Sequence, residues 1–141
     1  MKIVLASYFE PQYHGKGRKI GITPSCPKNL KEEHGYSCDL KFSDFSPEDI
    51  YWNYISAKKA AKDPESLKLA GDEFVNKYAE KLNSLKKTIE AQAKTENKTV
   101  MEVIGLQNED TLLSWELKGH LTFRTALSEF LTGFGYNVIS N

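Results

Sequence analysis

Four short apolar runs in the chain have the length of buried β-strands. They cover residues 2–8, 19–23, 111–115 and 136–139, and polar or turn-forming residues bound them. Continuous apolar runs of this length are typical of strands that are covered on both faces, as in a parallel sheet. A further short strand is expected over residues 36–40, within an otherwise polar stretch.

Longer segments carry apolar residues at spacings of three and four, which place these residues on one face of a helix. The longest begins at Asp63 and Pro64, an N-cap residue and a first-turn proline, and its apolar stripe continues to Ala93. Its outer face is charged, which indicates an amphipathic helix. A helix before it is predicted from a Ser46 cap to about residue 61.

Two shorter helices complete the pattern. Thr99 and Glu102 form a capping box that predicts a short helix ending at Gly105. Another helix is predicted from Phe123, with Thr122 as its N-cap. The 141 residues suit one domain. We therefore expect a single-domain, three-layer Rossmann-like α/β fold with a mostly parallel sheet and one long amphipathic helix.

Polar residues stand where three of the predicted strands end. Ligands of parallel sheets bind beyond the carboxyl ends of the strands and at the N-termini of the following helices. Because these ends meet at one edge, we expect the polar side chains to form a ligand site. The alternative is that they only terminate the strands, since Ser and Thr are common at such positions. The residues are Ser7, Tyr8, Thr23, Ser25, Ser114 and Glu116.

The chemistry expected at this edge is that of an anion site. Arg124, near a helix start, can hold a phosphate or carboxylate in a bidentate fork, and the amides of Phe123 and Arg124 favour negative charge. Thr122 belongs to the same turn. Arg18 or Lys19 would add positive charge from the loop after the first strand. The alternative for Arg124 is an ordinary solvated position on the helix.

Aromatic and titratable residues near the same edge extend this hypothesis. Tyr8 or Trp115 would stack on a base. If the protein is an enzyme, Glu116 and His120 are the candidate general acid and base near the anion. No motif selects a reaction.

Three stretches share a pattern with a known family. They are Leu113-Ser-Trp-Glu-Leu-Lys-Gly-His-Leu-Thr-Phe-Arg124 with Leu127-Ser-Glu-Phe-Leu131, Ala6-Ser-Tyr-Phe9, and Ile20-Gly-Ile-Thr-Pro-Ser-Cys-Pro-Lys28. In these stretches the chain resembles the domain of unknown function 488 family, and the resemblance extends over nearly the whole chain. It implies an α/β fold and a site at the start of the last helix, without a settled activity.

The chain departs from this family at two positions of the implied site. The family's last helix opens with Cys-His-Arg, whereas this chain has Thr122, Phe123 and Arg124, so a thiol and a neighbouring imidazole are missing. The arginine that follows the family's second strand is replaced by Pro24 or shifted. The resemblance therefore implies that catalysis through that cysteine and histidine is lost here.

The composition is that of an ordinary globular protein, with 40% hydrophobic and 27% charged residues and a net charge of zero. A neutral chain is unlike a protein that mainly coats nucleic acid. Residues 1–31 nevertheless hold six basic residues and one acidic residue, which is compatible with a phosphate-bearing ligand. No apolar run approaches the roughly 20 residues that cross a bilayer, and the first run is too short for a signal-peptide core. We expect a cytoplasmic protein without a membrane partner.

Cys26 and Cys38 are the cysteines of the chain. In a cytoplasmic protein they are expected to be reduced, with a single disulfide as the alternative. Together with His14 and His34 they could ligate zinc, but no paired Cys-x-x-Cys spacing is present. We therefore expect no metal and no cofactor.

The function expected from these features is binding of a phosphate-bearing ligand, either a nucleotide derivative or a nucleic-acid end. A rival hypothesis is a non-catalytic module that binds a protein or sequesters a ligand, which the missing Cys-His pair favours. A third is a homo-oligomer assembled along the long helix, without a small-molecule site. Whether the protein is an enzyme stays open.

Overall fold

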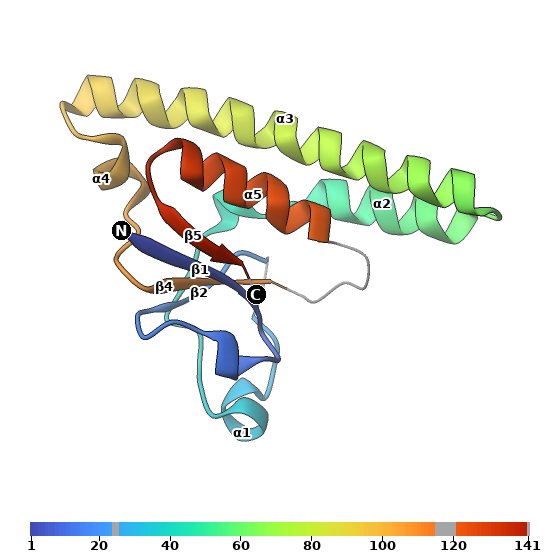
Figure 1. The fold of residues 1–141 in the computed structure, drawn as a ribbon, viewed down its shortest axis with the longest axis horizontal. Helices are drawn as coiled ribbons and strands as arrows, with labels where there is room; N and C mark the ends of the chain where they lie inside the picture. Colours follow the sequence, from blue (N-terminus) through green and yellow to red (C-terminus); the bar gives the residue numbers. More distant parts are fainter. Residues whose placement is uncertain (24–25, 115–120, 141) are drawn as a thin grey trace.

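The centre of the fold is a five-stranded sheet in which each strand is parallel to its neighbours (Figure 1). The spatial order of the strands is β3-β2-β4-β1-β5. This computed structural model describes residues 1–23, 26–114 and 121–140, except for the side chains of residues 43, 48, 49 and 121–123. The strands are β1 (Lys2–Ser7), β2 (Lys19–Gly21), β3 (Leu40–Lys41), β4 (Asp110–Ser114) and β5 (Asn137–Ser140). The predicted α/β, Rossmann-like fold with a parallel sheet is confirmed.

The residues of β1 show why this strand is apolar throughout. Ile3 and Leu5 pack in a core cluster that includes residues of the long helices, whereas Val4 and Ala6 pack in a second cluster on the opposite face. All four are 3% exposed or less. Because successive side chains of a strand point to opposite faces, a strand that is covered on both faces has no position for a polar residue.

Helices cover the face of the sheet that carries Ile3 and Leu5 (Figure 1). Phe74 and Tyr78 of the longest helix are buried there, and so is Leu131 of the last helix. The Tyr78 hydroxyl donates to the carbonyl of Phe45 at 2.7 Å, and burial raises the pKa of Tyr78. The helices on this side are α2 (Glu48–Ala60), α3 (Pro64–Glu96), α4 (Val100–Ile104) and α5 (Leu121–Gly133). The long amphipathic helix predicted from the apolar stripe is α3.

Two predicted helix starts are confirmed by their hydrogen bonds. The Asp63 carboxylate accepts the backbone N–H of Ser66 at 2.7 Å at the start of α3. Thr99 and Glu102 form both hydrogen bonds of the predicted capping box at the start of α4. Local sequence decided these starts, because a cap needs partners only within its own first turn.

Two other predicted caps are wrong. Pro47 occupies the N-cap position of α2, so Ser46 lies one residue too early. Ser46 is buried instead, and its carbonyl accepts a hydrogen bond from the Lys81 ammonium of α3. Thr122 lies inside α5, because that helix begins at Leu121.

The opposite face of the sheet is covered by short elements and by a disulfide. Figure 1 shows α1 (Leu30–His34) on this side, away from the long helices. A single 3₁₀ turn, η1 (Pro11–Tyr13), belongs to the connection that follows β1. Cys26 and Cys38 are joined, so the expected reduced thiols are not what the structure has. Their side chains pack with Leu30 against the sheet.

The short strand expected over residues 36–40 is displaced to Leu40–Lys41. The preceding residues contact the sheet in another way, because the Tyr36 hydroxyl donates to the carbonyl of Tyr8 and Cys38 is held by the disulfide. Because Tyr36 and Cys38 are held through their side chains, they do not extend the backbone pairing between β3 and β2.

Candidate functional site

The carboxyl ends of β1 and β4 lie side by side where the connections of the sheet diverge. After β1 the chain crosses the face that carries Val4, since Gly15 lies against that residue. After β4 the chain continues to α5 on the other face, since Leu127 of that helix packs in the cluster with Ile3 and Leu5. Open α/β sheets bind ligands beyond the carboxyl ends of neighbouring strands whose connections lie on opposite faces.

Ser7 and Ser114 form a pair of hydroxyl-bearing residues at this edge of the sheet. They are partners in the register between β1 and β4. The alternation of side chains places both on the face of Leu5 and Leu112, which is the face that α5 covers. They are 2% and 4% exposed, respectively. The Ser7 Oγ accepts the backbone N–H of Phe9 at 3.2 Å, so this oxygen is held in place while its own hydrogen can be donated.

Tyr8 and Thr23 form a second polar pair on the opposite face of the same edge. Their hydroxyl oxygens are 2.6 Å apart, and either can donate. The Tyr8 hydroxyl lies directly over Gly21, since a Cβ at that glycine would stand 2.6 Å from it. Burial raises the pKa of Tyr8, and the hydrogen bonds with Thr23 lower it by less. The strand pattern thus correctly predicted that these four residues meet at one edge, while their role in binding stays a prediction.

Tyr8 itself offers no surface on which a base could stack. Its residue surface is 0% exposed, and its ring packs with Val4, Leu30 and Leu113. The expectation that Tyr8 stacks on a base is therefore wrong for this structure. The pattern could not reveal this, because the burial of Tyr8 depends on α1 and the disulfide-linked segment that cover it.

His14 is a site residue that the sequence hypothesis did not include. Its Nε2 lies 2.9 Å from the carbonyl oxygen of Ser7 at the end of β1. Since a carbonyl only accepts, Nε2 carries the hydrogen, and the neutral ring then presents Nδ1 as an acceptor. Burial lowers the pKa of His14, the Ser7 carbonyl raises it by less, and the charges of Lys19 and His34 lower it slightly. A neutral, oriented imidazole at a strand end is suited to accept a proton.

Tyr36 holds the His14 ring from the side. The two ring centroids are 4.9 Å apart with an interplanar angle of 89°. The Tyr36 hydroxyl donates to the Tyr8 carbonyl at 2.5 Å, so the ring is anchored at the same strand end. Burial, with a smaller contribution from Tyr8, raises the pKa of Tyr36 to about 12.

The sequence did contain a signal for His14, namely its position in the long loop after the first strand.

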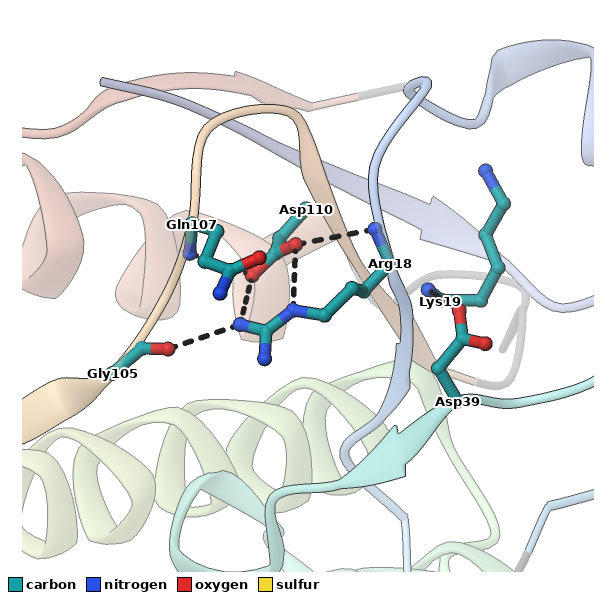
Figure 2. A network of polar contacts seen from close by, with 6 residues as sticks. All are labelled: Arg18, Lys19, Asp39, Gly105, Gln107 and Asp110. Carbon is teal, nitrogen blue, oxygen red and sulfur yellow. Dashed lines mark hydrogen bonds and ion pairs between the residues drawn. The ribbon is translucent and has the colours of Figure 1, made fainter.

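Arg18 lies at the opposite end of the sheet, so the structure does not bring it to the candidate site. Its guanidinium donates two hydrogen bonds to the Asp110 carboxylate, from Nε at 3.1 Å and from Nη2 at 2.6 Å (Figure 2). Asp110 opens β4, and its side chain is 1% exposed. The backbone N–H of Gln107 also donates to the carboxylate at 2.7 Å, and the Arg18 guanidinium donates to the Gly105 carbonyl. The hydrogen bond with Asp110 raises the pKa of Arg18.

Other basic residues of the N-terminal third are also placed away from the carboxyl edge of the sheet. Lys2 pairs with Glu109 at 3.2 Å. Lys19 opens β2, where its backbone N–H donates to Asp39 at 2.7 Å and its ammonium binds the Gly15 carbonyl. Arg18, Lys2 and Lys19 therefore do not supply positive charge at the carboxyl edge.

Arg124 belongs to the first turns of α5, the helix that comes next after β4 in the order of the elements. The helix begins at Leu121, and Arg124 is half-buried. Ser25, Trp115, Glu116 and His120 lie outside the described residues, and so does the side chain of Thr122. The proposed stacking by Trp115 and the acid and base roles of Glu116 and His120 stay predictions.

Metal ligation and membrane spanning have no support in the described parts of the chain. Within residues 1–23, 26–114 and 121–140, no group of three or more His, Cys, Asp or Glu side chains could hold a metal ion. The two cysteines of the rejected zinc hypothesis are bonded to each other. None of the helices in this part of the chain is both long and apolar enough to cross a bilayer.

No family model, curated protein or solved structure matches this chain. The resemblance to the domain of unknown function 488 family accordingly stays a prediction.

Proposed function

We propose that the protein binds a phosphate-bearing ligand, a nucleotide derivative or a nucleic-acid end, at the carboxyl edge between β1 and β4. The observation that carries the proposal is the register pairing of Ser7 and Ser114, two hydroxyl-bearing residues at the strand ends where the connections of the sheet turn to opposite faces. Parallel α/β sheets bind ligands at such points, and phosphate oxygens accept hydrogen bonds from hydroxyls and from the N-terminal amides of helices.

Arg124 would supply the charge that such a ligand needs. A guanidinium can donate two parallel hydrogen bonds to a phosphate, and the positive end of the α5 dipole favours the same anion. Ser7 and Ser114, which are partners in the register of β1 and β4, would donate their hydroxyl hydrogens to the phosphate as a hydroxyl floor. His14 would lie at the edge of the site as a proton acceptor, should the protein turn the ligand over.

The test is titration calorimetry of the purified protein with tripolyphosphate and with ATP, GTP, CTP and UTP. We expect a saturable signal with at least one of these compounds. The Arg124→Gln variant should bind at least tenfold more weakly, which corresponds to about 1.4 kcal/mol. The Ser114→Ala variant should also bind more weakly, because it removes a hydroxyl donor without adding bulk at this buried position.

Lys77→Gln is the matched control for the loss of one positive charge. Lys77 lies on α3, where it pairs with Glu73 at 2.9 Å and is 47% exposed. The control should bind like the wild-type chain and keep the same melting temperature. Equal affinity in Arg124→Gln and Lys77→Gln would remove Arg124 from the site, and no binding by the wild-type chain would overturn the proposal.

A second candidate function is protein binding or self-association through the helical layer. The observation that favours it is the exposure of large apolar side chains on the two antiparallel helices α2 and α3: Trp52 is 60% exposed, Leu67 42% and Leu69 69%. Leu67 belongs to the predicted apolar stripe, yet the structure leaves it uncovered. Sedimentation analysis of the wild-type chain and Leu69→Glu would test this, since an oligomer built on this surface should dissociate in the variant.

The location of the protein in the cell is a separate proposal, and the disulfide between Cys26 and Cys38 is relevant to it. Disulfides are rare in cytosolic proteins, where thiol reductants keep cysteines reduced. The bond between Cys26 and Cys38 therefore favours either an oxidising compartment or a cysteine pair that responds to redox conditions. Alkylation of thiols in intact cells, followed by mass spectrometry of the peptides with Cys26 and Cys38, would separate the two states.

A further inference from the structure

Phe9 is an exposed aromatic side chain at the carboxyl edge of the sheet. It directly follows six residues that are each 3% exposed or less, yet it is itself 42% exposed. Its N–H donates to the Ser7 Oγ at 3.2 Å, which holds the turn that follows β1. A flat apolar ring therefore stands two residues from the hydroxyl floor of the proposed ligand site.

His34 forms a second wall beside this ring. The ring centroids of Phe9 and His34 are 5.6 Å apart, and the ring planes are inclined by 54°. A planar aromatic group that stacks on one of these rings would meet the other ring with its edge, and both geometries are favourable for aromatic pairs. Phe9 also contacts the buried ring of Tyr8, with centroids 6.5 Å apart, so its inner side is supported.

The segment that carries His34 is fixed to the sheet at several points. Leu30, at the start of α1, is 5% exposed and packs in the cluster with Tyr8. Tyr36 donates a hydrogen bond to the Tyr8 carbonyl, and the disulfide between Cys26 and Cys38 closes the segment at both ends. Phe9 and His34 are thus presented on rigid supports, which lowers the entropic cost of binding a ligand against them.

The geometry points to Phe9 and His34 as the base-stacking subsite of a nucleotide whose phosphate lies over Ser7 and Ser114. This inference rests on the proposed function and narrows its ligand to a compound with both a nucleobase and a phosphate. Two residues span at most about 7 Å of extended chain, so the stacking ring and the hydroxyl floor are close enough for one nucleotide to reach both. The base would lie on the side of α1 and the phosphate on the side of α5, across the edge of the sheet.

The experiment compares the affinities of ATP, GTP, CTP, UTP and tripolyphosphate for the wild-type chain and its variants. Phe9→Leu removes the aromatic face but keeps an apolar side chain, and His34→Leu removes the second wall. Phe9→Tyr restores an aromatic ring. Trp52→Leu is the matched control, because Trp52 is also exposed but lies on α2 in the helical layer.

We expect Phe9→Leu to weaken nucleotide binding by on the order of tenfold, as for the loss of one stacking contact. His34→Leu should weaken it by less, and Phe9→Tyr should restore it. Tripolyphosphate should bind Phe9→Leu, Trp52→Leu and the wild-type chain equally, because it has no base.

The outcomes separate this inference from the function on which it rests. If tripolyphosphate binds and Phe9→Leu keeps the wild-type affinity for every nucleotide, the stacking subsite is refuted while the phosphate site stands. If tripolyphosphate and all four nucleotides fail to bind the wild-type chain, the phosphate site is refuted and the subsite with it. An equal loss of nucleotide binding in Phe9→Leu and Trp52→Leu would also refute the subsite.

Discussion

Replacing Asp110 with Asn should destabilise the protein far more than any comparable change at its surface. The carboxylate is buried at the first residue of β4 and accepts four hydrogen bonds (Figure 2). Two come from the Arg18 guanidinium, one from the Arg18 backbone N–H and one from the Gln107 backbone N–H. Asn has nearly the same volume, so the variant changes charge and hydrogen bonding without opening a cavity.

The expected loss is about 3 kcal/mol, because Asp110 is buried while the Arg18 guanidinium that loses its partner is 28% exposed. The amide of Asn can present its oxygen to only one side of the site. Its NH₂ group must then face N–H donors of Arg18 or Gln107, which leaves buried donors without an acceptor. For a chain of this size, about 3 kcal/mol corresponds to a decrease in melting temperature of roughly 10 °C.

Urea unfolding followed by circular dichroism, with thermal unfolding as a second measure, would test this prediction. Glu73→Gln is the control, because Glu73 forms an exposed ion pair with Lys77 and its side chain is 59% exposed. Such a pair contributes at most about 0.5 kcal/mol. The double variant Arg18→Met with Asp110→Asn should lose less stability than the sum of the single variants, since the two residues share one network. The reasoning is refuted if Asp110→Asn and Glu73→Gln are equally stable.

Three further changes have outcomes that follow from single contacts. Gly21→Ala should lower the free energy of unfolding, measured in urea, by about 1–3 kcal/mol, because the new methyl group would stand 2.6 Å from the buried Tyr8 hydroxyl. An unchanged free energy of unfolding would mean that the hydroxyl moves without cost. Thr99→Ala should lower the free energy of unfolding by about 1 kcal/mol, because it removes the acceptor for the backbone N–H of Glu102. An unchanged free energy of unfolding would show that the cap is dispensable. The pKa of Tyr36 should be about 12 in a phenolate absorbance titration. Since that pKa is raised above its usual value of 10.0, the stabilisation linked to the neutral phenol should be complete below pH 10 and lost as the pH rises towards 12. A titration at the usual value in the folded protein would contradict the burial of Tyr36.

The positions of β1, β2, β4 and β5 and of the long helix could be predicted from the sequence because they depend on local pattern, whereas β3 was displaced. β1 and β4 are continuous apolar runs, and the α3 stripe follows helical spacing. The caps at Asp63 and Thr99 were predictable because their hydrogen bonds lie within three residues. The meeting of Ser7 with Ser114 followed from one further rule, namely that the carboxyl ends of parallel strands share an edge.

The partners of individual side chains were decided by the tertiary structure alone. Arg18 was predicted to serve the ligand site, yet it pairs with Asp110, which lies 92 positions away in the chain and at the other end of the sheet. Tyr8 was predicted to stack on a base, but α1 and the disulfide-linked segment bury it completely. His14 was overlooked because its role depends on the Ser7 carbonyl and the Tyr36 ring, which meet it only in the folded chain.

The sequence by itself thus determined the segments of four strands and of helices α2 to α5, and which edge of the sheet collects polar residues, but neither α1 nor the position of β3. Periodicity and capping act over a few residues, and their physical causes are complete within each segment. Only the tertiary structure decided the strand order β3-β2-β4-β1-β5, the bond between Cys26 and Cys38, and the exposure of Phe9 beside His34. These features depend on which segments, distant in the sequence, pack together and exclude water. The burial of a side chain is therefore set by all the elements that surround it.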